Sequence, residues 1–232
     1  MRSLCVIPAR GGSKRIPRKN IKAFMGKPII AYAIEAALQS GLFNEVIVST
    51  EDEEIANISK EYGAKIPFMR SWDTASDYAT TFDVVEEVLS RYADEGVNFN
   101  TICCLYPCTP FVTSSKLREA NNLLIEQSYD VVFPIVSFSY PIQKTIREQN
   151  GKINYRNPEY STTRSQDLEE NYHDTGQFYF AKVDSLLAEQ RFVTKNTGGI
   201  IVDAMECQDI DHEVDWKIAE LKFQIFEKTN NI

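Results

Sequence analysis

The sequence predicts an α/β fold: a Rossmann-like, mostly parallel sheet flanked by helices. Short apolar runs that suit buried strands alternate along the chain with segments that place apolar residues at helical spacing. Glycines follow several of the helical segments, where they can end a helix. Because parallel neighbours need a crossover connection, usually a helix, this alternation favours a parallel sheet with helices on both faces.

The first half of the chain alternates predicted strands and helices. The strands are the apolar runs at residues 4–9, 45–50 and 65–69. The helices cover residues 28–41, 53–63 and 80–96. Gly41 and Gly63 end the first two of these helices, as glycine often does.

Predicted strands and helices also follow one another in the second half of the chain. Its predicted strands are residues 101–107, 130–136, 177–183 and 199–205. Its predicted helices are residues 113–127 and an amphipathic segment at 211–228. We therefore predict a single domain over residues 1–232.

Residues 138–177 interrupt the alternation. Within them, residues 141–157 are typical of a hairpin that turns at Asn150-Gly151. A polar segment with few helix signals follows at residues 158–176. We interpret residues 138–177 as an insertion that forms either a flap beside the substrate or an arm for oligomerisation.

Composition excludes several classes of partner. With 33 acidic against 25 basic residues, the net charge is −8, whereas nucleic-acid binders usually present a basic face. No apolar run approaches the roughly 18 residues that span a bilayer, and the residues before Pro8 are too few for a signal peptide. We expect no nucleic acid, no membrane and a cytoplasmic location. The five cysteines and two histidines lack the spacing of a zinc site, so we expect ordinary core cysteines.

The segment "IPARGGSKRIPRKN" at residues 7–20 is the local exception to the acidic balance. Its five cations are Arg10, Lys14, Arg15, Arg18 and Lys19. Ligands of open parallel sheets bind beyond the carboxyl ends of the strands, and Gly11 and Gly12 let backbone N–H groups approach a phosphate. The alternative is a solvated basic loop. Neither GxxxxGK[ST] nor GxGxxG is present, which disfavours Walker-type kinases and dehydrogenases.

Paired carboxylates occur near the other end of the chain, in "QDID". In an extended segment, Asp209 and Asp211 project from one face while Ile210 is buried on the opposite one. Mg²⁺ usually takes one or two carboxylates together with substrate phosphate and water, so this pair suits a magnesium site. Alternatively, Asp211 caps the final helix. We interpret Asp215 as an acid of the first helical turn.

Several motifs together resemble the CMP-sugar synthetases, cytidylyltransferases that activate nine-carbon acidic sugars. "PARGGSKRIPRKN" and "QDIDHEVDW" are similar to the first and last motifs of that family, "EVIVSTEDEEIA" to its second-strand motif and "LYPCTPF" to its fourth-strand turn. "PIQ" at 141–143 and "TRSQDLEENYHDTGQFYF" at 163–180 resemble the pseudaminic acid cytidylyltransferases in particular. The resemblance runs the length of the chain. It implies the nucleotide-diphospho-sugar transferase fold, CTP and an acidic nine-carbon sugar as substrates, a Mg²⁺ cofactor and a homodimer.

The resemblance also implies a nucleotide site. Its expected residues are Ala9, Arg10, Gly11, Gly12, Ser13, Lys14, Lys19, Asn20, Arg70 and Thr80. The expected catalytic residues are Arg10, Lys19, Asp209 and Asp211. Arg70 aligns with an arginine used near the cytosine base. Thr80 and Thr81 either touch the base or cap the next helix, and Arg15 and Arg18 are expected to be exposed.

Sugar recognition is expected from the insertion and from the fourth-strand turn. The candidates are Tyr106, Gln143, Lys144, Arg164, His173, Asp174 and Gln177. Arg164 is the first choice for the carboxylate of the sugar, and Lys144 the second. Tyr106 departs from the family, because sialic acid synthetases carry glutamine in a "QPTSP"-like turn there. Neighbouring aromatic residues are expected to pack the core or a dimer interface: Tyr172, Phe178, Tyr179 and Phe180.

The reaction implied is attack of the anomeric hydroxyl of pseudaminic acid on the α-phosphorus of CTP, with pyrophosphate as the leaving group. The same chemistry on N-acetylneuraminate, legionaminate or 3-deoxy-manno-octulosonate is the nearest alternative. A non-catalytic nucleotide-binding regulator on the same fold is another. Such a regulator would have no need of both Asp209 and Asp211, so their presence favours the enzyme. Glu51 stands where an aspartate is commoner, and we assign it no role.

Overall fold

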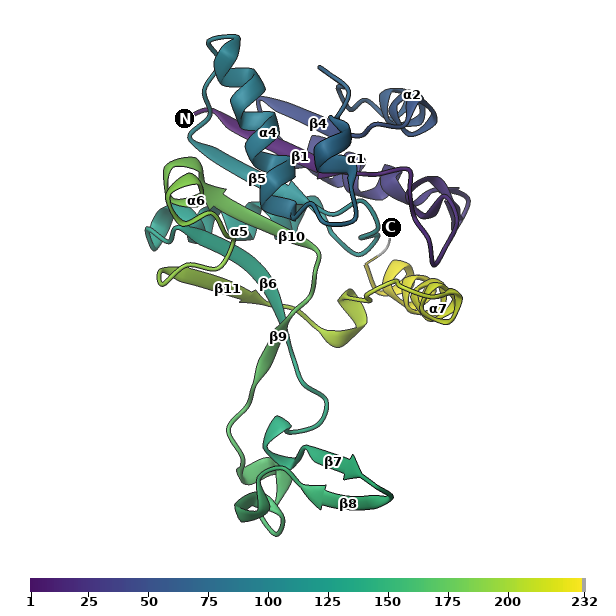
Figure 1. Ribbon diagram of the computed structural model, residues 1–232, viewed down its shortest axis with the longest axis vertical. Coiled ribbons are helices and arrows are strands. Elements are labelled where there is room, and N and C mark those ends of the chain that lie inside the picture. The colour runs from purple at the N-terminus through teal and green to yellow at the C-terminus, as the bar shows by residue number, and fades with distance from the viewer. Residues whose placement is uncertain (231–232) are drawn as a thin grey trace.

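The computed structural model describes residues 1–230 and is built around one mixed sheet (Figure 1). Its strands are β1 (Ser3–Pro8), β4 (Glu45–Ser49), β5 (Thr101–Leu105), β6 (Val131–Ser137), β9 (Tyr172–Asp174), β10 (Phe178–Lys182) and β11 (Thr197–Ile201). Within residues 1–230 the order is β11–β6–β10–β5–β1–β4, and β9 pairs with β6. Only β9 and β10 run against the common direction of the other strands. The predicted mostly parallel sheet is confirmed.

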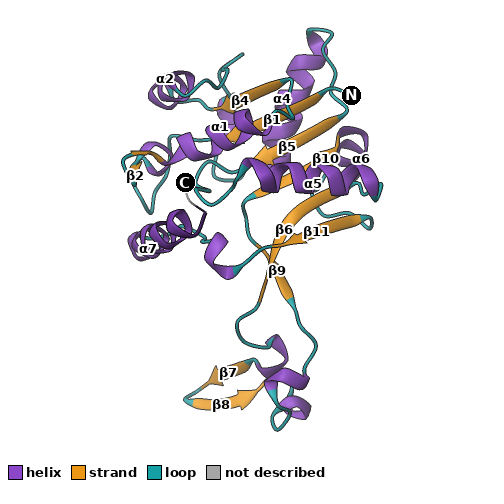
Figure 2. Cartoon of the chain, turned by 180° about the vertical axis from the view of Figure 1, so that it is seen from behind, coloured by secondary structure: helices purple, strands orange, loops and turns teal. Residues whose placement is uncertain are grey.

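Helices cover both faces of this sheet (Figures 1 and 2). α1 (Ile29–Ser40), α2 (Glu53–Glu61) and α5 (Ser114–Glu126) pack on one face. α4 (Thr81–Asp94) and α6 (Val183–Glu189) pack on the other. In the described part of the chain, no helix combines the length and the apolar character needed to cross a membrane.

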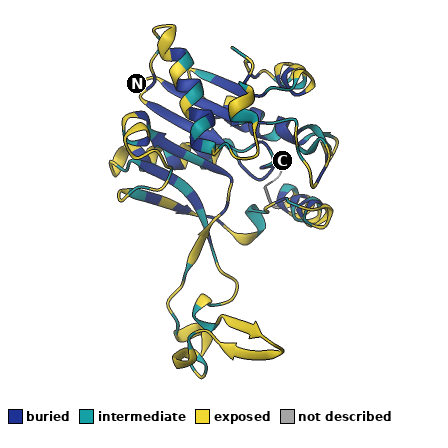
Figure 3. Ribbon diagram, in the orientation of Figure 1, coloured by how far each residue is buried: buried dark blue, intermediate teal, exposed yellow. Residues whose placement is uncertain are grey.

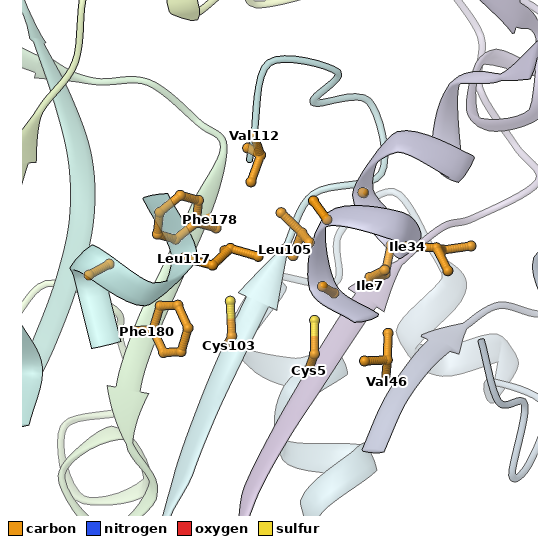
Figure 4. Packing of buried hydrophobic residues seen from close by; sticks show 14 of the residues in the cluster. Cys5, Ile7, Ile34, Val46, Cys103, Leu105, Val112, Leu117, Phe178 and Phe180 are labelled. Atoms are coloured by element: carbon orange, nitrogen blue, oxygen red, sulfur yellow. The ribbon is translucent and has the colours of Figure 1, made fainter. Parts of the chain in front are cut away.

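The apolar runs of the sequence arise because both faces of the central strands are covered. Successive residues of β1 point to opposite faces, so Cys5 and Ile7 pack with α1 and α5 while Leu4 and Val6 pack with α4. Figure 4 shows the first of these cores, where side chains of β1, β5 and β10 meet those of the two helices. A strand buried on both sides loses the alternation of apolar and polar residues, which explains the continuous pattern.

Local signals set the helix ends. Gly41 lies at φ 67° after α1, a left-handed conformation that glycine adopts without steric cost. Thr80 and Asp83 form a reciprocal capping box at the start of α4. Asp52 and Thr113 cap α2 and α5 through their side chains. The helices therefore begin and end close to the predicted residues.

A third core holds the C-terminal helix α7 (Glu213–Asn230) against the loop that follows β1. Trp216 and Phe223 of this helix surround Phe24 with edge-on ring contacts at 5.5 and 5.4 Å between centroids. Ile16 from the cationic loop and Ile210 from the segment before α7 are both buried in the same cluster. The two motifs at opposite ends of the sequence are thereby fixed beside each other.

Most of the predicted insertion forms an arm that projects from the body (Figures 1 and 3). At its end, β7 (Ile146–Gln149) and β8 (Lys152–Tyr155) form a hairpin in which every residue is exposed. Asn150 and Gly151 turn the hairpin with positive φ angles of 53° and 76°, so the predicted hairpin turn is confirmed. Its last strand, β9, returns to the sheet.

The predicted strand at residues 65–69 is wrong. Lys65 forms one isolated bridge with Ile47, and the chain then leaves the sheet at Pro67, which has no N–H to donate. Smaller elements were also not predicted: α3 (Trp72–Ala75), α6, β9 and the pair β2 (Ala23–Phe24) and β3 (Lys27–Pro28). These elements are too short to show a periodic pattern.

Candidate active site

A cavity of about 780 Å³ opens at the carboxyl ends of β1 and β5. The start of β10 reaches the same edge because β10 runs antiparallel to β5. The wall therefore combines the cationic loop, the turn after β5, the connection from β9 to β10 and the segment before α7. The sequence-predicted residues that line it are Arg10, Ser13, Lys14, Lys19, Asn20, Tyr106, His173, Asp174, Gln177 and Asp209.

The cationic loop is closed by Asn20, whose side chain is 5% exposed. Its amide Nδ2 donates to the carbonyl of Arg10 at 2.9 Å, and its Oδ1 accepts from the thiol of Cys108 at 3.2 Å. Ile16 anchors the middle of the loop in the third core. Asn20 thus joins both ends of the loop to the turn after β5, which keeps the cations at the cavity wall.

Four of the five cations line the cavity: Arg10, Lys14, Arg15 and Lys19. Arg10 and Lys14 share Asp77, with Arg10 at 2.6 Å from one carboxylate oxygen and Lys14 on the other. Lys19 donates to the carbonyl of Ile210 at 2.7 Å. Cations converging on one cavity are suited to a polyanionic ligand such as a triphosphate.

Arg15 also lines the cavity, with its guanidinium 2.6 Å from Asp211, whereas Arg18 points away from it. Arg18 forms ion pairs with Asp52 and Glu54 at the start of α2. The hydrogen bond from Arg18 holds the pKa of Asp52 below its usual value. Arg18 therefore ties the loop to the body of the protein.

Glu51 positions the loop backbone, a role that the sequence did not suggest. Its Oε1 accepts from the N–H of Gly11 at 2.7 Å, while its Oε2 is buried without a partner in the described part of the chain. A Cβ at Gly11 would lie 2.5 Å from Asp52 Oδ2, so a side chain there would force Asp52 to shift. Gly12 has open space around it. Ala9 is fully buried and does not line the cavity.

Arg70 and Thr80 are placed outside the cavity wall. Arg70 is 7% exposed and donates from Nε to Ser49 Oγ at 3.0 Å, and burial lowers its pKa. The side chain of Thr80 accepts from the backbone N–H of Asp83, which matches the capping alternative. Its neighbour Thr81 hydrogen-bonds instead to the hydroxyl of Tyr106 at 2.8 Å.

The turn after β5 and the start of β10 present hydroxyl groups to the cavity. Burial raises the pKa of Tyr106 to about 12, so this hydroxyl stays neutral at physiological pH. Tyr179, which we expected only to pack, also lines the cavity and donates to Asp174. Burial likewise raises the pKa of Tyr179. Phe178 and Phe180 are core residues, as expected.

The predicted sugar-binding residues fall into two groups. Tyr106, His173, Asp174 and Gln177 lie in the cavity wall. The others lie on the arm and do not line the cavity of their own chain: Gln143, Lys144 and Arg164. Arg164 is exposed and forms a two-pronged ion pair with Asp167 at 2.7 and 3.0 Å. One chain therefore does not bring Arg164 together with the cavity.

The paired carboxylates have different surroundings. Asp209 lines the cavity, and its carboxylate has no ion-pair partner among residues 1–230. Asp211 accepts from Arg15, and its Oδ1 lies 3.9 Å from the ammonium of Lys19. Asp215 accepts from the backbone N–H groups of Asp211 and His212. The free N–H groups at the start of α7 are therefore bonded by Asp215, and not by the side chain of Asp211 as the capping alternative supposed.

These carboxylates fit a cation that shares its ligands with a substrate. Within the described residues, no three or more His, Cys, Asp or Glu side chains gather as a preformed metal site. Mg²⁺ needs no such site when phosphate and water complete its shell. Asp209 presents an unpaired carboxylate to the cavity, whereas Asp211 does not line the cavity and is paired with Arg15.

Sequence analysis missed other cavity residues, among them Cys108, Thr109, Thr175, Cys207 and Gln208. Cys108 was expected to be an ordinary core residue, yet its thiol bonds to Asn20, and burial raises its pKa to about 12. Its position two residues after Tyr106, in a turn beyond a predicted strand, was the available signal. Cys5, Cys103 and Cys104 are buried core residues, as expected.

Comparison with known proteins places this site in a family. A family model described as "Cytidylyltransferase" matches residues 4–227. A "Pseudaminic acid cytidylyltransferase" of Campylobacter jejuni subsp. jejuni serotype O:2 is 37% identical over 226 residues, covering 97% of both chains. A "CMP-N,N'-diacetyllegionaminic acid synthase" of Legionella pneumophila is 35% identical over 229 residues, covering 95% of both.

The fold has solved counterparts at low sequence identity. A CMP:2-keto-3-deoxy-manno-octonic acid synthetase solved with CTP aligns with a TM-score of 0.68 at 17% identity, covering 98% of this chain and all of that one. A 4-diphosphocytidyl-2C-methyl-D-erythritol synthase from Anaerococcus prevotii aligns with a TM-score of 0.60 at 13% identity. The predicted nucleotide-diphospho-sugar transferase architecture agrees with these neighbours.

The geometry predicts different roles for two adjacent cations. Lys19→Gln should weaken binding of CTP, the nucleotide expected from the sequence, by about 10- to 100-fold, because a charge-assisted phosphate contact is lost. Arg18→Gln should leave that affinity near the wild-type value and lower the free energy of unfolding by about 1 kcal/mol or less. Calorimetric titration and thermal unfolding measure both. Equal losses of affinity would contradict the assignment of Arg18 to the body of the protein.

Proposed function

The chain belongs to the cytidylyltransferase family, and we propose that it transfers CMP from CTP to the anomeric hydroxyl of pseudaminic acid. The products are CMP-pseudaminic acid and pyrophosphate. The observation that carries this proposal is the composition of the cavity: cations on one wall, the unpaired carboxylate of Asp209 on another and neutral hydrogen-bonding groups beside β10. This is the set of groups that a nucleoside triphosphate and a hydroxylated acidic sugar require together.

The reaction needs charge to be balanced while a phosphoryl group is transferred. The anomeric oxygen of the sugar forms a bond to the α-phosphorus of CTP, and the bond from that phosphorus to the bridging oxygen breaks. The sugar hydroxyl gives up its proton to solvent water, and the electron pair of the broken bond leaves with pyrophosphate. Arg10, Lys14 and Lys19 stabilise the negative charge that grows on the leaving group.

We propose Mg²⁺ as the cofactor, held by Asp209 and Asp211 together with phosphate oxygens and water. When bound, the cation supplies electrostatic stabilisation of the pyrophosphate and acidifies a coordinated hydroxyl. The carboxylates orient that ensemble, since Ile210 between them is 2% exposed and anchors the segment. Lys19 links the cationic loop to the carboxylate segment, because it bonds to the carbonyl of Ile210 and lies close to Asp211.

Sequence similarity does not by itself select the sugar, because the relatives named for pseudaminic and legionaminic acids are 37% and 35% identical. The specific support comes from Tyr106 and from the stretch at residues 163–180. The neutral Tyr106 hydroxyl is held by Thr81 at 2.8 Å, where a glutamine would offer a different pattern of donors and acceptors. This favours a sugar other than sialic acid.

An assay of pyrophosphate release from CTP in the presence of Mg²⁺ and a sugar acid tests the function directly. Pseudaminic acid should be turned over with a kcat/KM at least about 100-fold above those of N-acetylneuraminic, legionaminic and 3-deoxy-manno-octulosonic acids, since a missing hydrogen bond leaves buried polar groups unpaired. A preference for another acid would replace the sugar and keep the reaction. Folded protein that binds CTP without releasing pyrophosphate with any acid would favour the regulator alternative.

The metal proposal predicts a specific shift in magnesium dependence. Asp209→Asn should raise the Mg²⁺ concentration for half-maximal activity by roughly tenfold or more, because a charged ligand becomes a neutral one. Glu213→Gln is a matched control, since Glu213 lies four residues away and forms its ion pair with Lys22. Activity assays over a Mg²⁺ series measure both. An unchanged Mg²⁺ curve for Asp209→Asn would remove that residue from the metal site.

We further propose that the protein acts as a homodimer in the cytoplasm, where CTP is made, and that the arm of each subunit completes the site of its partner. The arm exposes large apolar side chains: Phe138, Tyr140, Ile142, Ile146, Ile153, Tyr155, Tyr160 and Tyr172. So many exposed apolar side chains on one segment are typical of a protein interface. The arm also carries Arg164, which does not line the described cavity of its own chain.

Mixed dimers test this arrangement. Lys19→Gln and Arg164→Gln subunits, each of low activity alone, should recover about a quarter of the wild-type sites when equal amounts are unfolded and refolded together, because one site of each mixed dimer is intact. Lys19→Gln mixed with Asp209→Asn is the control. Both of those changes lie in the cavity, so no mixed dimer regains an intact site. No recovery in the first mixture would show that Arg164 acts in its own chain.

A further inference from the structure

Asp77 holds two of the cavity cations although it does not line the cavity itself. It lies in the loop between α3 and α4, and its Oδ1 accepts from Arg10 Nη1 at 2.6 Å. Its other oxygen, Oδ2, accepts from the ammonium of Lys14. The carboxylate therefore bridges the two cations with one oxygen on each. Two oxygens of a phosphate chain would make the same pair of contacts.

The surroundings of Asp77 allow this contact to be exchanged. The side chain of Asp77 is 44% exposed, and Tyr78 beside it is 94% exposed. The segment made of α3 and this loop is held at its two ends: Ser71 before α3 bonds to Glu87, and Thr80 forms the capping box of α4. Between these ends, the ion pairs of Asp77 join the loop to the cationic loop.

A ligand phosphate placed against Arg10 and Lys14 would meet the carboxylate of Asp77 at the same cations. Donors remain available on a lysine and an arginine, but two anions a few ångströms apart repel each other. Lys14 and Arg10 hold the pKa of Asp77 below its usual value, so the carboxylate stays charged at physiological pH. The phosphates and Asp77 must therefore compete.

We propose that Asp77 is a specificity-determining residue that competes with the β- and γ-phosphates for Arg10 and Lys14. It weakens the binding of CTP and of pyrophosphate but leaves the binding of CMP unchanged, because CMP has no phosphates at these positions. After transfer, the return of Asp77 to the two cations favours the departure of pyrophosphate. This inference rests on the proposed function, which places a triphosphate in the cavity.

The expected effect is modest because the ion pairs are partly exposed. The side chains of Arg10 and Lys14 are 40% and 77% exposed. Exposed pairs contribute little each, so loss of the competitor should tighten phosphate binding by roughly three- to tenfold. The gain in affinity should shrink in 1 M salt, where the Debye length is only about 3 Å and charges farther apart are screened.

Asp77→Asn tests the inference, with Asp73→Asn as the matched control. Asp73 belongs to the neighbouring α3, carries the same charge and forms no ion pair in the described part of the chain. Each variant and the wild type are titrated calorimetrically with CTP, pyrophosphate and CMP at constant Mg²⁺. The expected result is three- to tenfold tighter binding of CTP and pyrophosphate by Asp77→Asn, with CMP unchanged and Asp73→Asn like the wild type.

Several outcomes would overturn the inference. Equal tightening for all three ligands, or the same gain in Asp73→Asn, would assign the effect to net charge. Weaker or unchanged binding of CTP by Asp77→Asn would mean that Asp77 orients the cations instead of competing for them. Failure of the proposed function is a separate result: the wild-type protein itself would then release no pyrophosphate from CTP with any sugar acid.

Discussion

The repulsion among the cations of one short loop is the constraint on which the site depends. Arg10 to Lys19 place five positive charges within ten positions, and such a segment would extend into solvent unless other forces held it. Ile16 supplies one of these forces by packing into the third core with Ile210 and Trp216. Acids supply the other, because each of the five cations pairs with a carboxylate from outside the loop.

The acids that balance the loop also join it to three distant parts of the chain. Asp211 comes from the segment before α7, Asp77 from the loop before α4 and Asp52 from the start of α2. Each ion pair is partly exposed and contributes little to stability by itself. Their joint effect is positional, because they hold segments from distant parts of the chain around the cationic loop. The same charges are then presented to a polyanion.

The sequence allowed most of the framework to be predicted, because the strands are buried on both faces and the helices carry clear end signals such as Gly41 and Thr80. The cationic loop and Asp209 could be predicted as cavity residues, since both adjoin predicted strand or helix ends. Tertiary contacts decided the rest. Arg70 turns inward to Ser49, and Glu51 reaches the N–H of Gly11 across 40 positions of sequence. No local pattern encodes such a pairing.

The arm shows why residues predicted to bind the same sugar lie far apart in one chain. His173 and Asp174 lie on β9, which is tied to β6 and therefore stays at the cavity. Arg164 lies beyond the point where the chain leaves the sheet, so its position depends on whatever the arm packs against. A buried sheet fixes the nucleotide end of the site within one chain, whereas the distal sugar contacts depend on the proposed dimer. In the proposed dimer, changes in the arm would alter the sugar contacts without disturbing the sheet that positions the cationic loop.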